Sequence, residues 1–239
     1  PTKAPTPTPT PKPEPTPTAT PIIEATEEEM ITGKFNTSTK IQSKYTWTAA
    51  YVNDEYGRVF HADDTSTLTI NKDGLKSSGS YKSYVTRTEW KDNCEYESTF
   101  NYGETKWRYT DSTGDNWEED RVKLTKDITK FGFDFDRFKI KKSKTSKDTI
   151  TITGTYTINK TANTVYDMLA LEILESQVTV GDVNKVTADV TITIDLKTKS
   201  MKKAVLNYNM NGEEFGRAAS GEEGLDLFID SYTHTFTFK

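Results

Sequence analysis

Aromatic side chains are the residues of this chain that could most readily support a binding function. The four tryptophans, with several tyrosines, crowd its first half: Trp47, Trp90, Trp107, Trp117, Tyr45, Tyr51 and Tyr109. Such rings can line an apolar cavity or stack on sugar rings, and they also fill the core between a sheet and its helices. Core packing is the simpler interpretation for any single ring. As a set, one or two are expected to face a ligand.

The acidic residues single out no catalytic pair and no metal site. The cluster Asp111, Asp115 and 118–120 lacks the alternating ligands and central glycine of an EF-hand loop, so a solvated turn is the simpler interpretation. Asp63 and Asp64 are interpreted in the same way. A glycosidase would need two carboxylates across a cleft, and no such pair stands out.

Nucleophilic, zinc and phosphate chemistry have equally little support. His61 and His234 are the two histidines, and neither has a cysteine or aspartate at ligand spacing. His234 lies on the apolar face of a predicted strand. We therefore expect a residue at the edge of the core whose ring makes a hydrogen bond. Glu95 beside Cys94 would raise the thiol pKa. Without a G-x-S-x-G elbow or a phosphate-binding glycine loop, we predict no catalytic residue, no metal, no cofactor and no enzyme activity.

Charge argues against nucleic acid as a partner. The formal net charge is −5, and because residues 1–23 contribute +1, residues 24–239 carry −6. A nucleic-acid binder should instead show a basic domain or stripe. One basic run follows Arg137 and contains Lys139, Lys141, Lys142, Lys144 and Lys147. It could touch anionic lipid or wall polymer, but a solvated strand edge or loop, where lysine blocks edge pairing, is the simpler interpretation.

Strands with one apolar face dominate the predicted structure. Apolar and polar residues alternate from Val186 to Leu196 and again from Ala204 to Met210, which predicts two antiparallel strands with one buried face. The same pattern runs through Thr149–Ile158, where Gly154 indicates a bend or bulge. It recurs from Ile41 to Tyr51 and from Tyr232 to Phe238. Short strands with turns at 71–74, 91–93 and 111–116 predict a meander in the first half.

Two helical segments are predicted between the strands. Ile128, Phe131, Phe135 and Phe138 form one helical stripe, although Phe131, Phe133 and Phe135 would also fit a strand. Residues 164–167 resemble a capping box that opens an apolar helix over 164–177, which would be buried or would cover an apolar hollow. Residues 24–31 allow at most one weak helical turn.

The N-terminal residues read as a separate segment. All nine prolines lie between Pro1 and Pro21, nearly one in every second position, which excludes helix and sheet. Such a segment is extended and would reach on the order of 60 Å. We therefore predict a Pro/Thr-rich extracytoplasmic linker over residues 1–23 and one domain over 24–239. A surface tether is favoured over a plain interdomain linker. No run of about 18 apolar residues occurs.

The fold class expected is mainly β (α+β): one strongly curved antiparallel sheet, a half-barrel, with one or two helices against its concave side. The segments TITGTYTI, TANTVYDMLALEILES and VTADVTITIDLKTKSMKKAVLNYN resemble the LolA-like half-barrel, and with YGETKWRYTDSTGDNWEED they resemble Gram-positive lipoproteins of that fold without an assigned function. The likeness covers roughly residues 80–210. A lipocalin-like closed barrel is the alternative.

The resemblance implies a monomeric, membrane-anchored extracytoplasmic lipoprotein of a Gram-positive bacterium, anchored by a lipid upstream of the linker. Its curved sheet would bind a hydrophobic, lipid-like ligand under the helix at 164–177, at about 0.8 kcal/mol per buried methylene. A carbohydrate-binding module, with a row of exposed coplanar rings, and an adhesive or structural surface domain are the alternatives. The residues expected to contact the ligand are Trp47, Tyr51, Trp90, Trp107, Tyr109, Phe131, Phe135, Met168 and Leu171.

Overall fold

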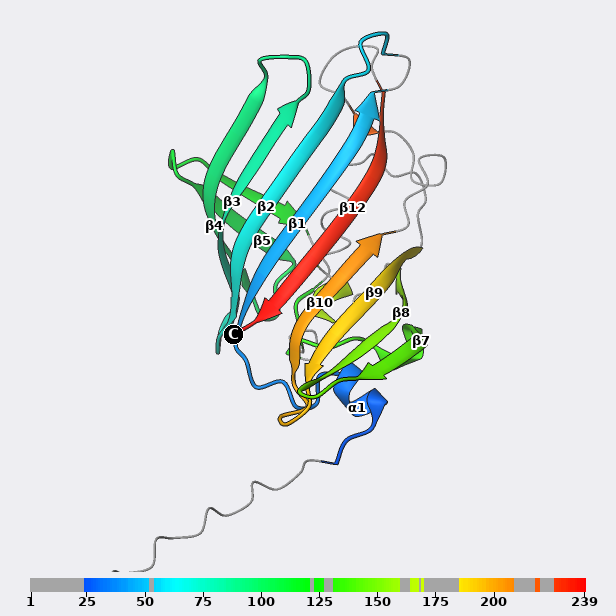
Figure 1. The fold of residues 1–239 in the computed structure, drawn as a ribbon. Helices are drawn as coiled ribbons and strands as arrows, with labels where there is room; N and C mark the ends of the chain where they lie inside the picture. The colour runs from blue at the N-terminus through cyan, green and yellow to red at the C-terminus, as the bar shows by residue number, and fades with distance from the viewer. Residues whose placement is uncertain are drawn as a thin grey trace, which may run out of the picture.

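A curved antiparallel sheet dominates the computed structural model of the chain (Figure 1). The structure describes residues 24–51, 54–120, 123–126, 131–159, 164–167, 169, 185–208, 218–219 and 226–239. The predicted linker over residues 1–23 therefore lies outside the described residues.

The strands follow the chain in two runs that meet at the centre of the sheet. They are β1 (Lys40–Tyr51), β2 (Val59–Ile70), β3 (Gly74–Val85), β4 (Lys91–Asn101), β5 (Lys106–Asp111), β6 (Asn116–Asp120), β7 (Phe138–Thr145), β8 (Thr149–Asn159), β9 (Lys185–Asp195), β10 (Met201–Tyr208), β11 (Ala218–Ala219) and β12 (Asp226–Phe238). Their order is β6-β5-β4-β3-β2-β1-β12-β10-β9-β8-β7, and the short β11 pairs with β12. All described pairings are antiparallel, and β12 joins the two runs by pairing with both β1 and β10.

The sheet is an open half-barrel and not a closed barrel. In the described part of the chain β6 and β7 pair on one side only, so they are its two edges. Four of the five lysines of the basic run lie on the edge strand β7, where five successive residues from Lys141 to Thr145 are exposed, and Lys147 follows in the exposed turn to β8. Lysines at this position oppose pairing with another strand, so the simpler interpretation of the basic run is confirmed.

The strands with strict alternation of apolar and polar residues form as predicted. β9 and β10 pair with each other, and the inward residues Val190, Ile192, Ala204 and Leu206 are buried. Gly154 on β8 faces the point where the β7 register shifts between Ile140 and Lys142, which confirms the predicted bulge. A Cβ at Gly154 would lie 2.6 Å from the Phe138 ring, so glycine is required for the close approach of β7 and β8.

The predicted helix over 128–138 is wrong for its described part. Residues 131–134 are not helical, and only a single 3-10 turn, η1 (Phe135–Arg137), forms before β7. The backbone of this segment bonds to distant groups instead of to its own next turn. Phe133 N donates to Ile31 O at 2.9 Å, and Asn36 Nδ2 donates to Phe131 O at 2.6 Å. Tertiary hydrogen bonds therefore override the helical spacing of the phenylalanines.

The turn expected at 91–93 is also misplaced. These residues begin β4, and the chain reverses over 86–90 between β3 and β4. Arg87 adopts a left-handed φ of 61° in this turn. The polarity of 91–93 has a different origin, because they lie at an exposed strand end.

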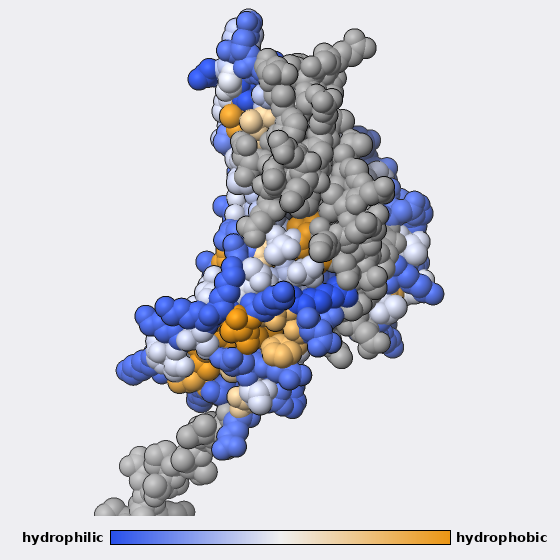
Figure 2. All heavy atoms as spheres, turned by 90° about the vertical axis from the view of Figure 1, so that its right-hand side faces the viewer, coloured by the Kyte–Doolittle hydropathy of each residue, from blue (hydrophilic) through white to orange (hydrophobic). Residues whose placement is uncertain are grey.

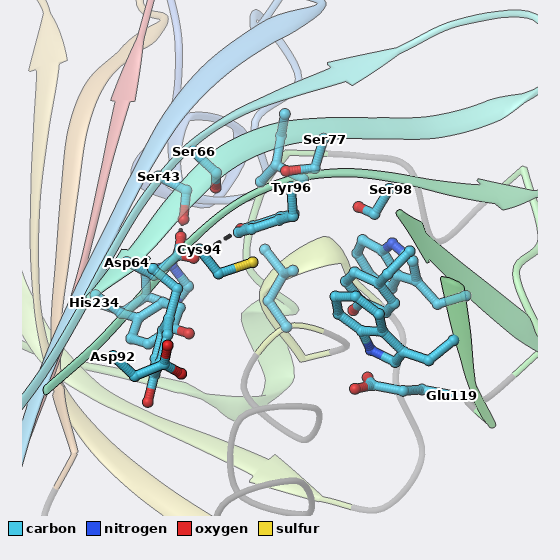
Figure 3. Close-up of a pocket in the computed structure, with 17 residues that line it drawn as sticks. Ser43, Asp64, Ser66, Ser77, Asp92, Cys94, Tyr96, Ser98, Glu119 and His234 are labelled. Carbon is cyan, nitrogen blue, oxygen red and sulfur yellow. Dashed lines mark hydrogen bonds between the residues drawn. The ribbon is translucent and has the colours of Figure 1, made fainter. Parts of the chain in front are cut away.

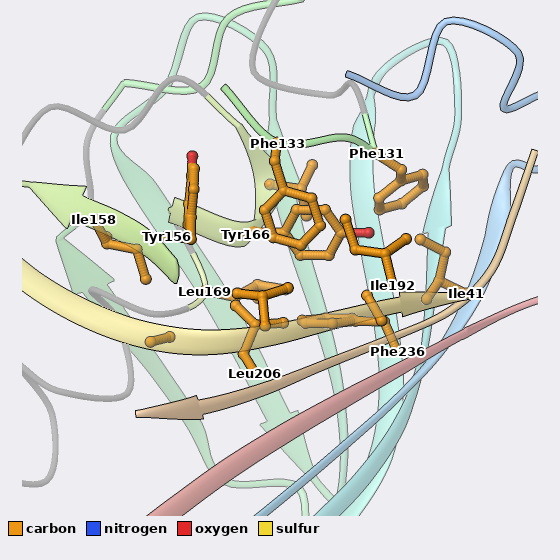
Figure 4. Packing of buried hydrophobic residues seen from close by; sticks show 14 of the residues in the cluster. Ile41, Phe131, Phe133, Tyr156, Ile158, Tyr166, Leu169, Ile192, Leu206 and Phe236 are labelled. Atoms are coloured by element: carbon orange, nitrogen blue, oxygen red, sulfur yellow. The ribbon is translucent and has the colours of Figure 1, made fainter. Parts of the chain in front are cut away.

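Short helical segments and aromatic side chains cover the inner face of the sheet. Helix α1 (Glu27–Ile31) is capped by Thr26 and Glu29 and buries Met30 and Ile31. Phe133 stacks on Tyr166 with centroids 4.4 Å apart, and Tyr166 packs edge-on against Phe236 of β12 (Figure 4). None of the described helices is long and apolar enough to span a membrane.

The predicted capping box at Thr164 is confirmed. Asp167 N donates to Thr164 Oγ1 at 3.2 Å, and Thr164 N donates to Asp167 Oδ2 at 3.1 Å. The described residues of this segment are 164–167 and 169, so most of the predicted helix over 164–177 lies outside them. Val165 and Leu169 are buried, which agrees with a helix that packs against the sheet.

Candidate ligand-binding site

The register of the first four strands aligns small polar residues on the inner face. Ser43 on β1 lies opposite Ser66 on β2, and Ser77 on β3 lies opposite Ser98 on β4. All four serines are buried. Because serine side chains are small, their alignment at neighbouring inward positions leaves space on this part of the inner face.

This space is a hollow of about 340 Å³ on the inner face (Figure 3). We call it the serine-floored hollow, and its floor consists of Ser43, Ser66, Ser77 and Ser98. Asp64, Ser43 and His234 lie at one end and Glu119 at the other. Leu169 of the capped segment also lines it. A hollow beneath this segment was expected, but its floor is polar where the expectation was apolar.

An aromatic wall closes one side of the hollow. Trp107 and Tyr109 lie two residues apart on β5, and Trp117 on β6 pairs directly with Tyr109. The Trp107 and Tyr109 rings are inclined by 13° with centroids 5.9 Å apart, and the Tyr109 and Trp117 rings by 4° at 5.1 Å. Of the three, Trp117 is the most exposed, at 39%. Together the three rings form an apolar surface that lines the hollow.

Asp64 is a buried carboxylate at one end of the hollow. Its side chain is 2% exposed, and Oδ2 accepts a hydrogen bond from the Tyr96 hydroxyl at 2.8 Å. Oδ1 has no hydrogen-bond partner among the described residues. Burial raises the pKa of Asp64 to about 6, against the opposing effect of hydrogen bonds from Tyr96 and Ser66. The interpretation of Asp64 as a solvated acid is therefore wrong, whereas Asp63, on the opposite face, is exposed.

His234 and Ser43 form a close pair beside Asp64. His234 Nε2 lies 2.6 Å from Ser43 Oγ, while Nδ1 has no partner among the described residues. The expected satisfied hydrogen bond is thus present on one ring nitrogen only. Burial lowers the pKa of His234 to about 3, so the ring is neutral and a weak base. A Ser–His nucleophile needs an effective base oriented by a third group, and this pair lacks both.

Other residues around the hollow also have buried polar atoms without hydrogen-bond partners in the described residues. Ser98 Oγ and Trp107 Nε1 also lack hydrogen-bond partners among the described residues. With Asp64 Oδ1 and His234 Nδ1, four such atoms belong to residues that line the hollow. Buried polar atoms are normally paired, so a concentration of unpaired ones marks a place for a ligand or ordered water.

Cys94 lines the hollow but does not have the environment of a nucleophile. Burial and the carboxylates of Asp111, Asp92, Asp64 and Glu95 raise the pKa of its thiol. The direction agrees with the sequence-based expectation, although burial is the largest cause. In the described residues no group of three or more His, Cys, Asp or Glu side chains could hold a metal ion.

Of the nine aromatic and apolar residues predicted to contact a ligand, the seven that the structure describes do not all lie in one place. Trp107 and Tyr109 line the serine-floored hollow. Trp47 packs on Phe60, which contacts Trp90 in a separate cluster, and Arg58 lies over the Tyr51 ring. Phe131 is buried and Phe135 is half-buried in the apolar core. Met168 and Leu171 lie outside the described residues.

The sequence does not predict the polar floor, because the residue pattern of one strand does not show which strands lie beside it. The inward alternation Ala62, Asp64, Ser66 and Leu68 on β2 was a usable signal, since it places Asp64 on the buried face. Recognising a hollow also requires knowing that Ser77 and Ser98 are neighbours of this strand. That information comes from strand pairing.

The fold and the hollow together define an open antiparallel half-barrel with a small-molecule-sized site on its inner face. No protein-family model matches the sequence, and no curated protein matches it either. A solved structure of a DUF1329 family protein from Desulfovibrio piger is similar over 86% of each chain, with 8% sequence identity and a TM-score of 0.28.

Proposed function

We propose that this protein binds a small hydrophobic, lipid-like molecule in the serine-floored hollow, with the polar end of the ligand at Asp64 and His234. The observation that carries the proposal is that four residues lining the hollow, Asp64, Ser98, Trp107 and His234, each hold a buried polar atom without a partner among the described residues. A ligand that satisfies them would recover the free energy lost when they were removed from water.

Shape and lining support an amphipathic ligand. A volume of about 340 Å³ lies within the usual range of small-molecule sites. The parallel rings of Trp107, Tyr109 and Trp117 offer an apolar surface for the body of the ligand, and Leu169 adds to it from the capped segment. One short apolar chain or ring system would suit this space better than several long acyl chains.

The carbohydrate-binding alternative is less well supported by the described residues. A sugar-binding row would need several exposed rings side by side. The two exposed tryptophans, Trp90 and Trp117, instead pack in different clusters, on Phe60 and on Tyr109. The weak base at His234 and the raised thiol pKa of Cys94 favour a non-enzymatic role. A Pro/Thr spacer would hold the binding domain at a cell surface, which is the localisation we propose.

Binding can be tested with the full chain and the fluorescent probe N-phenylnaphthylamine. We expect saturable binding of one probe per chain, with increased probe fluorescence. Ser77→Leu fills the floor of the hollow and should weaken binding at least about fivefold, because a side chain that occupies the space of the ligand adds an overpacking cost of about 1–3 kcal/mol. Ser78→Leu is the matched control, since Ser78 lies next in sequence but is exposed on the other face.

A second variant tests the same site independently in case Ser77→Leu does not fold. Trp117→Ala removes a partly exposed ring of the wall on the edge strand β6, and it should also weaken binding while the circular dichroism spectrum stays unchanged. Equal probe affinity in wild type, Ser77→Leu and Trp117→Ala would refute binding in this hollow. Native mass spectrometry before and after organic extraction would reveal a co-purified ligand.

A further inference from the structure

The charge of the hollow is one-sided. Among the described residues that line it are three acids, Asp64, Asp92 and Glu119, and no lysine or arginine. Asp64 is the buried one, and no described cation pairs with it. A buried carboxylate without a cation is strongly unfavourable, so this end of the hollow is suited to a positive group and opposes a negative one.

The surroundings of Asp64 are aromatic. In the sheet register it lies opposite Tyr45 on β1 and opposite Tyr81 on β3. Tyr96 donates its hydroxyl to Oδ2, and all three tyrosines line the hollow. Ring faces attract organic cations, and the attraction grows where water is excluded. A carboxylate set among tyrosines therefore favours an organic cation over a neutral polar group.

Two buried acceptors lie at this end of the hollow, one on Asp64 and one on His234. Asp64 Oδ1 is buried and unpartnered. His234 is neutral, and the tautomer in which Nε2 donates to Ser43 Oγ leaves Nδ1 as a second buried acceptor. A protonated amine has N–H donors for both atoms. A metal ion fits less well, because the described residues hold no cluster of three ligating side chains.

We propose that the ligand of the serine-floored hollow carries a protonated amine, which binds at the Asp64 carboxylate beside Tyr45 and Tyr81, while its apolar part lies along Trp107, Tyr109 and Trp117. This inference rests on the proposed function and specifies its ligand class. Anionic amphiphiles such as fatty acids are then poor ligands, since their carboxylates would face Asp64 and Asp92.

Three probes with one skeleton separate charge from apolar fit: phenylbutylamine, phenylbutanol and phenylbutyrate. Each is titrated into the full chain by calorimetry at pH 7.5. The amine should bind at least about tenfold more tightly than the alcohol, because a desolvated charge-assisted contact and cation–π attraction add to the same apolar contacts. Phenylbutyrate should bind most weakly.

Asp64→Asn should reduce amine affinity to that of the alcohol and leave the alcohol affinity unchanged. The matched control is Asp63→Asn, which removes the same charge from the adjacent, exposed residue and should preserve the amine preference. Equal affinity for amine and alcohol in wild type, or an amine preference that survives Asp64→Asn, would overturn the cation assignment and leave ligand binding in place. Absence of binding by all three probes would overturn the proposed function as well.

Affinity for the amine should also depend on pH, since it requires an ionised Asp64. The titratable groups that face the hollow with it are Tyr45, Tyr81, Asp92, Cys94, Tyr96, Tyr109, Glu119 and His234. Burial keeps Asp64 protonated up to a pKa of about 6, so amine affinity should fall between pH 7.5 and pH 5. Phenylbutanol is titrated in parallel to detect any other effect of pH. Its affinity should change less than twofold over the same range.

Discussion

The hydroxyl of Tyr156 on β8 donates a hydrogen bond to Asp167 Oδ1 at 2.8 Å, and Asp167 is fully buried. The other carboxylate oxygen accepts from Thr164 N at 3.1 Å and from Arg137 at 3.5 Å. One carboxylate thus joins the capped segment, strand β8 and the turn η1. This contact positions Leu169, which lines the hollow two residues further along the chain.

Removing this contact should destabilise the protein. Tyr156→Phe leaves the ring packing but removes the donor to Asp167, and we expect the free energy of unfolding to fall by about 1–3 kcal/mol. Tyr208→Phe is the control, because the Tyr208 hydroxyl is buried without a hydrogen-bond partner in the described residues. It should be neutral or stabilising. Urea unfolding followed by circular dichroism measures both, and equal losses in the two variants would contradict the role of Asp167.

Asp64 should lower the stability of the ligand-free protein at neutral pH. Its folded-state pKa of about 6 lies above the ordinary value of 3.8, so its contribution is most favourable at low pH and is lost as pH rises through about 6. Asp64→Asn should therefore be more stable than wild type by about 1–3 kcal/mol at pH 7.5. The difference should shrink at pH 4. A variant that is less stable than wild type at pH 7.5 would contradict an unpaired buried carboxylate, and Asp63→Asn should stay within about 0.5 kcal/mol.

His234 should have the opposite pH dependence. Its folded-state pKa of about 3 lies below the ordinary value of 6.5, so the stability it contributes is present above pH 6.5 and is lost as pH falls toward 3. His234→Gln keeps a hydrogen-bonding group near Ser43 and should cost about 1 kcal/mol at pH 7.5. Its deficit should close, and then reverse, as pH is lowered to 4.5. A deficit that stays constant with pH would show that His234 is not buried in its neutral form.

Strand formation followed from local sequence, and the sequence predicted it well. Alternation in β8, β9, β10 and β12 assigns each side chain to one face, whatever the neighbouring strand. The capping box at Thr164 and the bulge at Gly154 were predictable for the same reason, since both depend on residues close in the chain. The resemblance also led to the open, curved sheet that the structure shows.

Features that join distant segments were decided by tertiary structure. Phe131, Phe135 and Phe138 have helical spacing, but hydrogen bonds that join the backbone of Phe131 and Phe133 to Asn36 and Ile31 hold this segment in another form. Asp64 is polar in sequence and buried in the fold. The hollow arises only where pairing of β1 to β4 aligns four serines and this aspartate. By itself the sequence determined which face of each strand is buried, because that depends on a period of two. Which small side chains become neighbours, and so where space is left, depends on the register between strands.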